Sequence, residues 1–112
     1  EDVQSFVFRD TRPFDLSRLG VFLGLMIEIH GSDMLRYKGV LHVAGKPHRM
    51  VFQGVHMIMG CDQGKPWGGD EKRESVLVFI GRKLPKDVFQ DGLERCLVGA
   101  DGDDYLAHLP AV

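Results

Sequence analysis

The chain has 112 residues, of which 44% are hydrophobic and 27% are charged. This length and composition indicate one folded domain with its own core, and they exclude a disordered tail, a coiled coil and a membrane-spanning protein. With 14 basic and 16 acidic residues the net charge is −2, so no overall basic field would attract nucleic acid or an anionic membrane.

The cysteines and the first residues bear on the cellular compartment. The two cysteines, Cys61 and Cys96, lie far apart and neither belongs to a Cys-x-x-Cys pair, which is typical of reduced thiols in a cytoplasmic protein. No apolar run reaches the ~18 residues that span a bilayer, and the N-terminus is not a signal peptide. Because the chain begins with Glu1 and not with Met, we expect it to be an excised part of a longer protein.

The first two expected elements are a strand and a helix. Residues 3–8 are rich in β-branched and aromatic side chains, which favours a strand. Asp15 is a good N-cap, and leucines at helical spacing predict a helix from Leu16 to about Met26. Gly20 and Gly24 weaken this helix, and we expect them to allow close packing on a sheet.

A β-hairpin is expected next. Residues 34–43 and 48–59 are strand-like, and Gly45-Lys46 suits the tight turn between them. One face of the hairpin is mostly apolar, with the pairs Val43–His48, Leu41–Met50, Gly39–Phe52, Tyr37–Gly54 and Leu35–His56. The other face is amphipathic and carries Arg36, Lys38, Val40 and His42 opposite Val55, Gln53, Val51 and Arg49.

A loop, a strand and a helix complete the expected elements. Residues 60–74 contain four glycines and many polar side chains, which predicts a long loop. Residues 75–80 are almost continuously apolar, as in a central strand. Pro85 suits the first turn of a helix that Gly99 would close. We therefore expect a domain over residues 1–98, followed by a partly mobile tail over residues 99–112.

The order of these elements is β-α-β-β-β-α. This order predicts an α+β fold, with a mainly antiparallel four-stranded sheet and two helices on one face. The other face of the sheet would then have no helical cover.

No motif for catalysis is found in the sequence. Both Gly-Lys pairs are followed by Pro, so neither forms a phosphate-binding loop. The five histidines lack metal-ligand spacing; His56, with Cys61 five residues later, is the best candidate ligand, but a structural zinc needs about four. Cys61 is also the more accessible thiol for nucleophilic catalysis. We predict no catalytic residue and no complete metal site.

The amphipathic face of the hairpin is the candidate interface. Its basic side chains have no aromatic neighbours on the same face, which argues against RNA binding, and a mixture of arginine and aliphatic residues suits a protein partner. The only tryptophan, Trp67, is either a plug over an edge of the core or an interface anchor. The candidate interface residues are Arg36, Lys38, Gln53, His56 and Trp67.

Six separated blocks of the chain are distinctive. They are Ser5-Phe6-Val7-Phe8, Arg12-Pro13-Phe14-Asp15, Met34-Leu35-Arg36-Tyr37-Lys38-Gly39-Val40-Leu41, Arg49-Met50-Val51-Phe52-Gln53-Gly54-Val55-His56, Pro66-Trp67-Gly68 and Leu77-Val78-Phe79-Ile80-Gly81. In this order, and over roughly residues 3–98, the blocks resemble the C-terminal domain of the CobW family, which includes YjiA-like and YciC-like proteins.

The resemblance implies a role in a larger protein. Members of this family have an N-terminal domain with a P-loop, a guanine-specificity motif and a Cys-x-Cys-Cys metal motif, and they look like GTP-dependent metal chaperones or insertion factors. Their metals are zinc or cobalt, as in cobalamin synthesis or nitrile hydratase activation. None of the N-terminal motifs is present here, so the resemblance implies that this chain is not an enzyme and needs no cofactor. GTP, Mg²⁺ and zinc or cobalt are implied for the intact protein.

Three hypotheses for function follow. The first is a non-catalytic interaction or regulatory domain that contacts its own N-terminal GTPase domain or a client metalloprotein, with no nucleic acid and no membrane involved. The second is a direct metal-binding module in which His56 and Cys61 help a site completed by ligands from elsewhere. The third is a thiol enzyme at Cys61, which a normal thiol pKa would dismiss.

Overall fold

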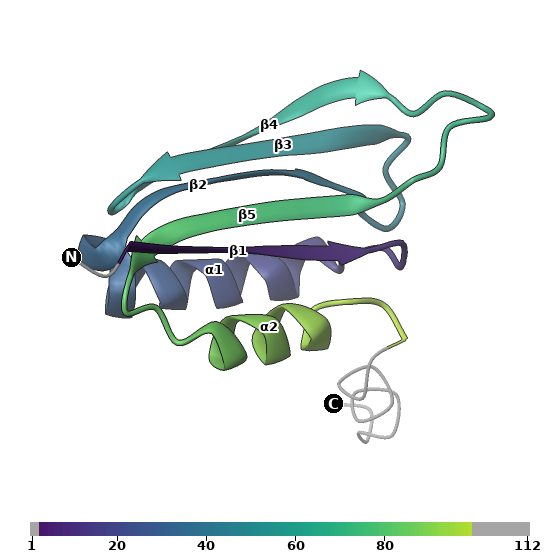
Figure 1. Cartoon of the computed structure of the whole chain (residues 1–112). Helices are drawn as coiled ribbons and strands as arrows, with labels where there is room; N and C mark the ends of the chain where they lie inside the picture. Colours follow the sequence, from purple (N-terminus) through teal and green to yellow (C-terminus); the bar gives the residue numbers. More distant parts are fainter. Residues whose placement is uncertain (1–2, 100–112) are drawn as a thin grey trace, which may run out of the picture.

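A computed structural model of the chain describes residues 3–99 and has two layers, a sheet and a pair of helices (Figure 1). The α+β class and the antiparallel sheet are confirmed, and the strands are ordered β1-β5-β2-β3-β4. In chain order the elements are β1 (Val3–Asp10), α1 (Leu16–His30), the 3-10 turn η1 (Gly31–Asp33), β2 (Met34–Leu41), β3 (His48–Val55), β4 (Ile58–Pro66), β5 (Ser75–Arg82) and α2 (Lys86–Arg95).

The sheet has five strands, one more than predicted. The additional strand is β4, which includes the end of the expected strand 48–59 and the first part of the expected loop 60–74. It lies at the edge of the sheet and pairs only with β3, so its residues do not need the apolar alternation that identifies a half-buried strand. The remaining loop covers residues 67–74.

The first helix is longer than predicted, and the second is shorter. As expected, Asp15 caps α1, and its carboxylate accepts a hydrogen bond from the Arg18 backbone N–H at 3.0 Å. The helix continues four residues past Met26 because Ile27 extends its buried side. In contrast, α2 ends at Arg95, so Gly99, with φ of 90°, lies in a later turn. The expected mobile tail falls, apart from Gly99, outside the described residues.

The core lies between the sheet and the helices, and Phe79 of the interior strand β5 is at its middle. Its ring is 5.4 Å from that of Phe6 on β1 and 5.2 Å from that of Phe89 on α2, measured between centroids. Phe79 has no exposed surface, and β5 lies between β1 and β2, so the expected central strand 75–80 is interior, one place from the middle of the sheet. The buried Ser75 is satisfied because its hydroxyl accepts the backbone N–H of His42 at 2.8 Å.

The predicted hairpin register is confirmed at its centre. Leu41 faces Met50, Gly39 faces Phe52 and Tyr37 faces Gly54. The two outer predicted pairs are not part of this ladder. Val43 instead forms a bridge with Phe14, and the N–H of His56 donates to the carbonyl of Met34 at 2.8 Å. The predicted Leu35–His56 pair does not form because the chain already turns at His56 and Met57.

Within residues 3–99, neither helix is long and apolar enough to cross a bilayer.

Candidate interaction surface

The helices cover only one side of the sheet (Figure 1). Along β2, Tyr37 and Leu41 are buried toward the helices, so Arg36 and Lys38 point to the other side. We call this helix-free side the open face. It includes Val7 of β1, Val76, Val78 and Ile80 of β5, Arg36, Lys38 and Val40 of β2, Val51, Gln53 and Val55 of β3, and Ile58 and the acidic Asp62 of β4.

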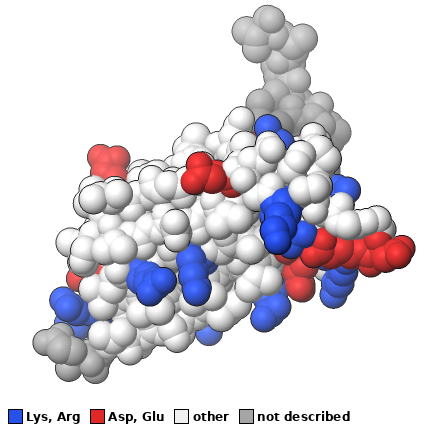
Figure 2. All heavy atoms as spheres, turned by 90° about the horizontal axis from the view of Figure 1, so that it is seen from above, with Lys and Arg blue, Asp and Glu red and all other residues white. Residues whose placement is uncertain are grey.

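The structure brings three of the candidate interface residues together on the open face. Arg36 and Lys38 are two residues apart on β2, and Gln53 is the direct cross-strand partner of Lys38. Among residues 3–99, the side chains of Arg36 and Lys38 have no hydrogen bond or ion pair. Viewed from the β4 side of Figure 1, the surface is mostly uncharged; basic side chains are spread across it, and acidic side chains gather mainly at one end (Figure 2).

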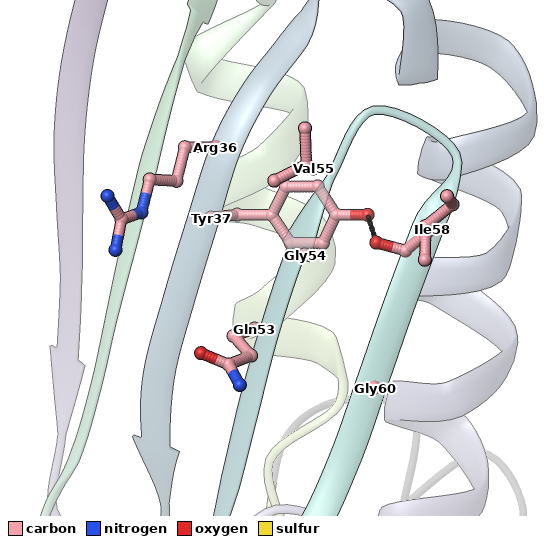
Figure 3. Close-up of a pocket in the computed structure, with 7 residues that line it drawn as sticks. All are labelled: Arg36, Tyr37, Gln53, Gly54, Val55, Ile58 and Gly60. Carbon is pink, nitrogen blue, oxygen red and sulfur yellow. Dashed lines mark hydrogen bonds between the residues drawn. The ribbon is translucent and has the colours of Figure 1, made fainter.

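Two hollows follow the open face and meet at Gln53. The first, of about 460 Å³, is lined by Arg36, Gln53, Val55 and Ile58, with glycine backbone between them (Figure 3). The second hollow, of about 330 Å³, has an apolar floor, and Lys38 is the charged residue in its lining. The floor and walls of the second hollow include Val40, Val51, Val76 and Val78.

A glycine on β3, Gly54, makes room for a buried tyrosine beneath the first hollow. A Cβ atom on Gly54 would collide with the ring of Tyr37, which passes beneath it. The Tyr37 hydroxyl donates to the carbonyl of His56 at 2.8 Å and lies 3.4 Å from that of Ile58 (Figure 3). Tyr37 therefore ties β2 to the turn after β3, and the missing side chain at Gly54 makes room for the Tyr37 ring on the helix side of the sheet.

His56 and Cys61 are not brought together with other histidine, cysteine or acidic donors among the described residues. His56 lies in the two-residue turn between β3 and β4, with φ of 52°, and not within a strand as predicted. Cys61 pairs with the buried Phe52, so it lies on the side of the sheet opposite Arg36. No group of three histidine, cysteine or acidic residues that could hold a metal ion occurs within the described part of the chain.

The thiols are poorly suited to nucleophilic chemistry. Partial burial, together with the neighbouring Asp62, raises the pKa of Cys61, so its thiol stays protonated at neutral pH. Cys96 is buried beside α2, and this burial raises its pKa to about 11. The interpretation of Cys96 as a core residue is confirmed.

Trp67 closes one end of the open face. Only 9% of the residue is exposed, and the guanidinium of Arg49 lies over its ring at 4.5 Å from the centroid. Its backbone N–H donates to the carbonyl of Pro47 at 3.0 Å, and its ring meets that of His42 at 6.0 Å. This placement agrees with the plug interpretation of Trp67 and makes it a support for the open face.

Sequence reasoning missed the residue that fixes this plug. Glu71 accepts hydrogen bonds from the backbone N–H of Gly68 at 2.9 Å and from Arg49 at 2.6 Å. These two donors lower the pKa of Glu71. Sequence reasoning also missed the apolar floor of the second hollow. The continuous apolar run 75–80 predicts a strand that is buried on both sides, but Val76 and Val78 lie on the open face.

Comparison with known proteins gives concordant similarities. Residues 3–97 match the family described as "Cobalamin synthesis protein cobW C-terminal domain". The chain is 38% identical over 86 residues to zinc chaperone YjiA of Escherichia coli K12, covering 77% of this chain and 27% of YjiA. It is 36% identical over 75 residues to zinc chaperone CobW of Pseudomonas aeruginosa, covering 67% and 20% of the two chains.

A solved structure has the same fold. The crystal structure of Zn(II)-bound YjiA GTPase from E. coli superposes with a TM-score of 0.82 at 34% identity, over 86% of this chain and 30% of that chain. The chain therefore spans less than a third of the length of these relatives.

Proposed function

Because this chain belongs to the cobalamin synthesis protein CobW C-terminal domain family, we propose that it is the non-catalytic interaction and regulatory domain of a GTP-dependent metallochaperone. The family that matches is the C-terminal domain and not the GTPase domain, and two similar proteins are named zinc chaperones. On this proposal the intact, cytoplasmic protein binds GTP, Mg²⁺ and zinc or cobalt through its preceding domain. The present domain contacts that domain or a client metalloprotein that receives the metal.

The observation that carries this proposal is the unpaired charge at the centre of the open face. Arg36 and Lys38 have no partner within residues 3–99, although Arg49 and Arg12 are each held by carboxylates. Aliphatic side chains surround the two cations, and a mixture of arginine and apolar surface is typical of protein interfaces. A partner with an acidic and apolar surface would form ion pairs with the two cations and cover the valine side chains of the second hollow.

Charge reversal in the intact polypeptide tests the proposal. Replacing both cations, Arg36→Glu and Lys38→Glu, should weaken binding of a client apoprotein, or cross-linking to the GTPase domain, by at least about tenfold (~1.4 kcal/mol). The charge-matched control is Lys46→Glu with Lys86→Glu, one lysine in the β2–β3 turn and one at the start of α2, and it should behave like the wild type. Unchanged client affinity together with an unchanged cross-linking yield in the first variant contradicts the proposal.

The second candidate function is direct metal binding at His56 and Cys61, which the naming of the relatives as zinc chaperones favours. Both side chains come from the same hairpin, and ligands from elsewhere would have to complete the site. Calorimetry with Zn²⁺ and Co²⁺ separates this function from the first. Stoichiometric metal binding at micromolar or lower concentration that disappears in the His56→Ala, Cys61→Ser variant would favour metal binding. If no heat of binding is measured, only the function as an interaction domain remains.

A further inference from the structure

Three sulfur-bearing side chains occupy every second position where the β3–β4 turn leads into β4. They are Met57, Met59 and Cys61, and we call them the sulfur edge. Because side chains alternate along a strand, Met59 and Cys61 point to the same side of the sheet. Cys61 is the cross-strand partner of Phe52, which is buried toward the helices. The sulfur edge therefore lies on the helix side of the sheet and not on the open face.

Met57 points to this side too, although it belongs to the turn. The expected packing of Gly20 and Gly24 on the sheet is wrong, because a Cβ atom on either would meet nothing within 4 Å. A close glycine contact occurs instead at Gly31, directly after α1, where an added Cβ atom would collide with the sulfur of Met57. The thioether of Met57 therefore bends toward the helix layer, as the other members of the sulfur edge do.

The helices leave the sulfur edge uncovered. Met57 and Met59 are 56% and 37% exposed, and Cys61 is exposed as well. Strand β4 is the outermost strand of the sheet and lies far from α2 (Figure 1). The methionines that fill the core are different residues, since Met26 and Met34 are only 5% and 1% exposed. The sulfur edge therefore presents its side chains to solvent.

The donors of the sulfur edge select a soft metal ion. Zinc sites are built from cysteine, histidine and acidic side chains, and no group of three such residues gathers within residues 3–99. Thioether and thiolate sulfur instead favour monovalent copper. The Cα atoms of Met59 and Cys61 are about 7 Å apart along the strand, and two side chains that lean toward each other can share one ion across this spacing. Met57 has three rotatable side-chain bonds, so its exposed thioether can turn to the same ion.

We propose that the sulfur edge is a binding site for monovalent copper, with Cys61 as a thiolate ligand and Met57 and Met59 as thioether ligands. The site does not rest on the proposed function, because it lies across the sheet from the open face and uses donors of another kind. Burial raises the pKa of Cys61, so the free thiol carries its proton at neutral pH. The copper ion replaces this proton, and binding releases one proton per ion.

Anaerobic titration of the 112-residue chain with Cu⁺ tests the proposal. Ascorbate keeps the copper reduced, and a coloured Cu⁺ chelator competes with the chain, so that the absorbance of the chelator complex gives the affinity. Met57→Leu with Met59→Leu removes both thioethers at nearly constant volume. The matched control is Met26→Leu with Met34→Leu, which removes two buried thioethers. Cys61→Ser removes the thiol, and circular dichroism checks that each variant is folded.

The wild type is expected to bind one Cu⁺ per chain and to release one proton per ion in weakly buffered solution. Loss of a group that only orients a ligand costs about 10–100-fold in metal affinity, so loss of the ligands themselves should cost at least about tenfold. We expect this loss both in the variant without the two exposed thioethers and in Cys61→Ser, which should also release no proton. The control should bind Cu⁺ like the wild type.

Three results would overturn the proposal. The first is a wild type that binds no Cu⁺ at micromolar concentration. The second is unchanged Cu⁺ affinity in the Met57→Leu, Met59→Leu variant, because the thiol then acts without the thioethers. The third is an equal loss of affinity in the control, because a change in the fold then explains both. None of these results bears on Arg36 and Lys38, so the proposed function would still stand.

Discussion

At the scale of single residues, one arginine organises an end of the open face. Arg49 stacks on Trp67, donates to the carbonyl of Lys65 at 3.2 Å, and forms an ion pair with Glu71 at 2.6 Å. A cation over an indole face contributes about 0.5–2 kcal/mol, depending on how far it is removed from water. The same side chain therefore fixes the plug, the end of β4 and the loop after it.

The pKa of Glu71 predicts how this end responds to acid. The hydrogen bond from the Gly68 backbone N–H lowers this pKa most from its ordinary value of 4.5, and the hydrogen bond from the Arg49 side chain lowers it further. The stabilisation from these contacts is complete above pH 4.5 and is lost as the pH falls through the lowered pKa. Fluorescence of Trp67, the only tryptophan, should therefore keep its neutral-pH spectrum to below pH 4.5 and then shift to longer wavelength.

The control for this prediction is Glu71→Gln, which keeps an acceptor for the Gly68 N–H but cannot titrate. Its Trp67 spectrum should show no transition in this range. A transition above pH 4.5 in the wild type, or the same transition in the variant, would show that another group controls the loop.

At the scale of elements, the β3–β4 hairpin shows how two glycines in similar strands have different consequences. Gly54 and Gly60 lie on adjacent paired strands, and both line the first hollow of the open face. An added Cβ atom meets the Tyr37 ring at Gly54 and nothing within 4 Å at Gly60. The first glycine is required for packing, and the second is not.

We predict that Gly54→Ala destabilises the protein by about 1–3 kcal/mol, because the Tyr37 ring must move and strain its hydrogen bond to His56. Gly60→Ala should change the unfolding free energy by less than about 1 kcal/mol, and in the stabilising direction, because it reduces the freedom of the unfolded chain. Urea unfolding of both variants measures the difference. Equal unfolding free energies would mean that Tyr37 does not need the space below Gly54.

At the scale of the whole molecule, aromatic packing connects the two layers. Phe79 on the interior strand β5 contacts rings on other strands of the sheet and on α2. Its aromatic contacts are Phe6, Tyr37, Phe52 and Phe89. A domain of this size is stable by only about 5–15 kcal/mol, so losing the centre of this cluster affects both layers together.

Phe79→Ala should therefore cost about 3–5 kcal/mol, from lost burial and the cavity left behind. Its neighbour Val78 lies on the open face and is only partly buried, so Val78→Ala should cost less than about 1.5 kcal/mol. Circular dichroism at helix wavelengths and near-ultraviolet aromatic signals should report one common unfolding midpoint in each variant. Separate midpoints for the two signals would contradict a single shared core.

The local patterns of the sequence were sufficient for most of the fold. The hairpin register at Gly39–Phe52 and the Asp15 cap depend on neighbours in the chain and on turn chemistry, and both are confirmed. Edge strand β4 could not be predicted in this way. Its polar residues and glycines indicate a loop, and only the hydrogen bonds offered by β3 make it a strand. Helix lengths also depend on burial, as the extension of α1 over Ile27 illustrates.

The sequence by itself determined the family and the α+β class, because the distinctive blocks and the expected elements follow one another in a characteristic order. It also determined that Arg36, Lys38 and Gln53 share one face, because side chains alternate with a period of two along strands. Only the tertiary structure decided that the two cations have no partner within residues 3–99, that Trp67 is buried under Arg49, and that the sulfur edge is exposed. The physical reason is that burial, pairing and exposure belong to the packing of elements distant in the chain.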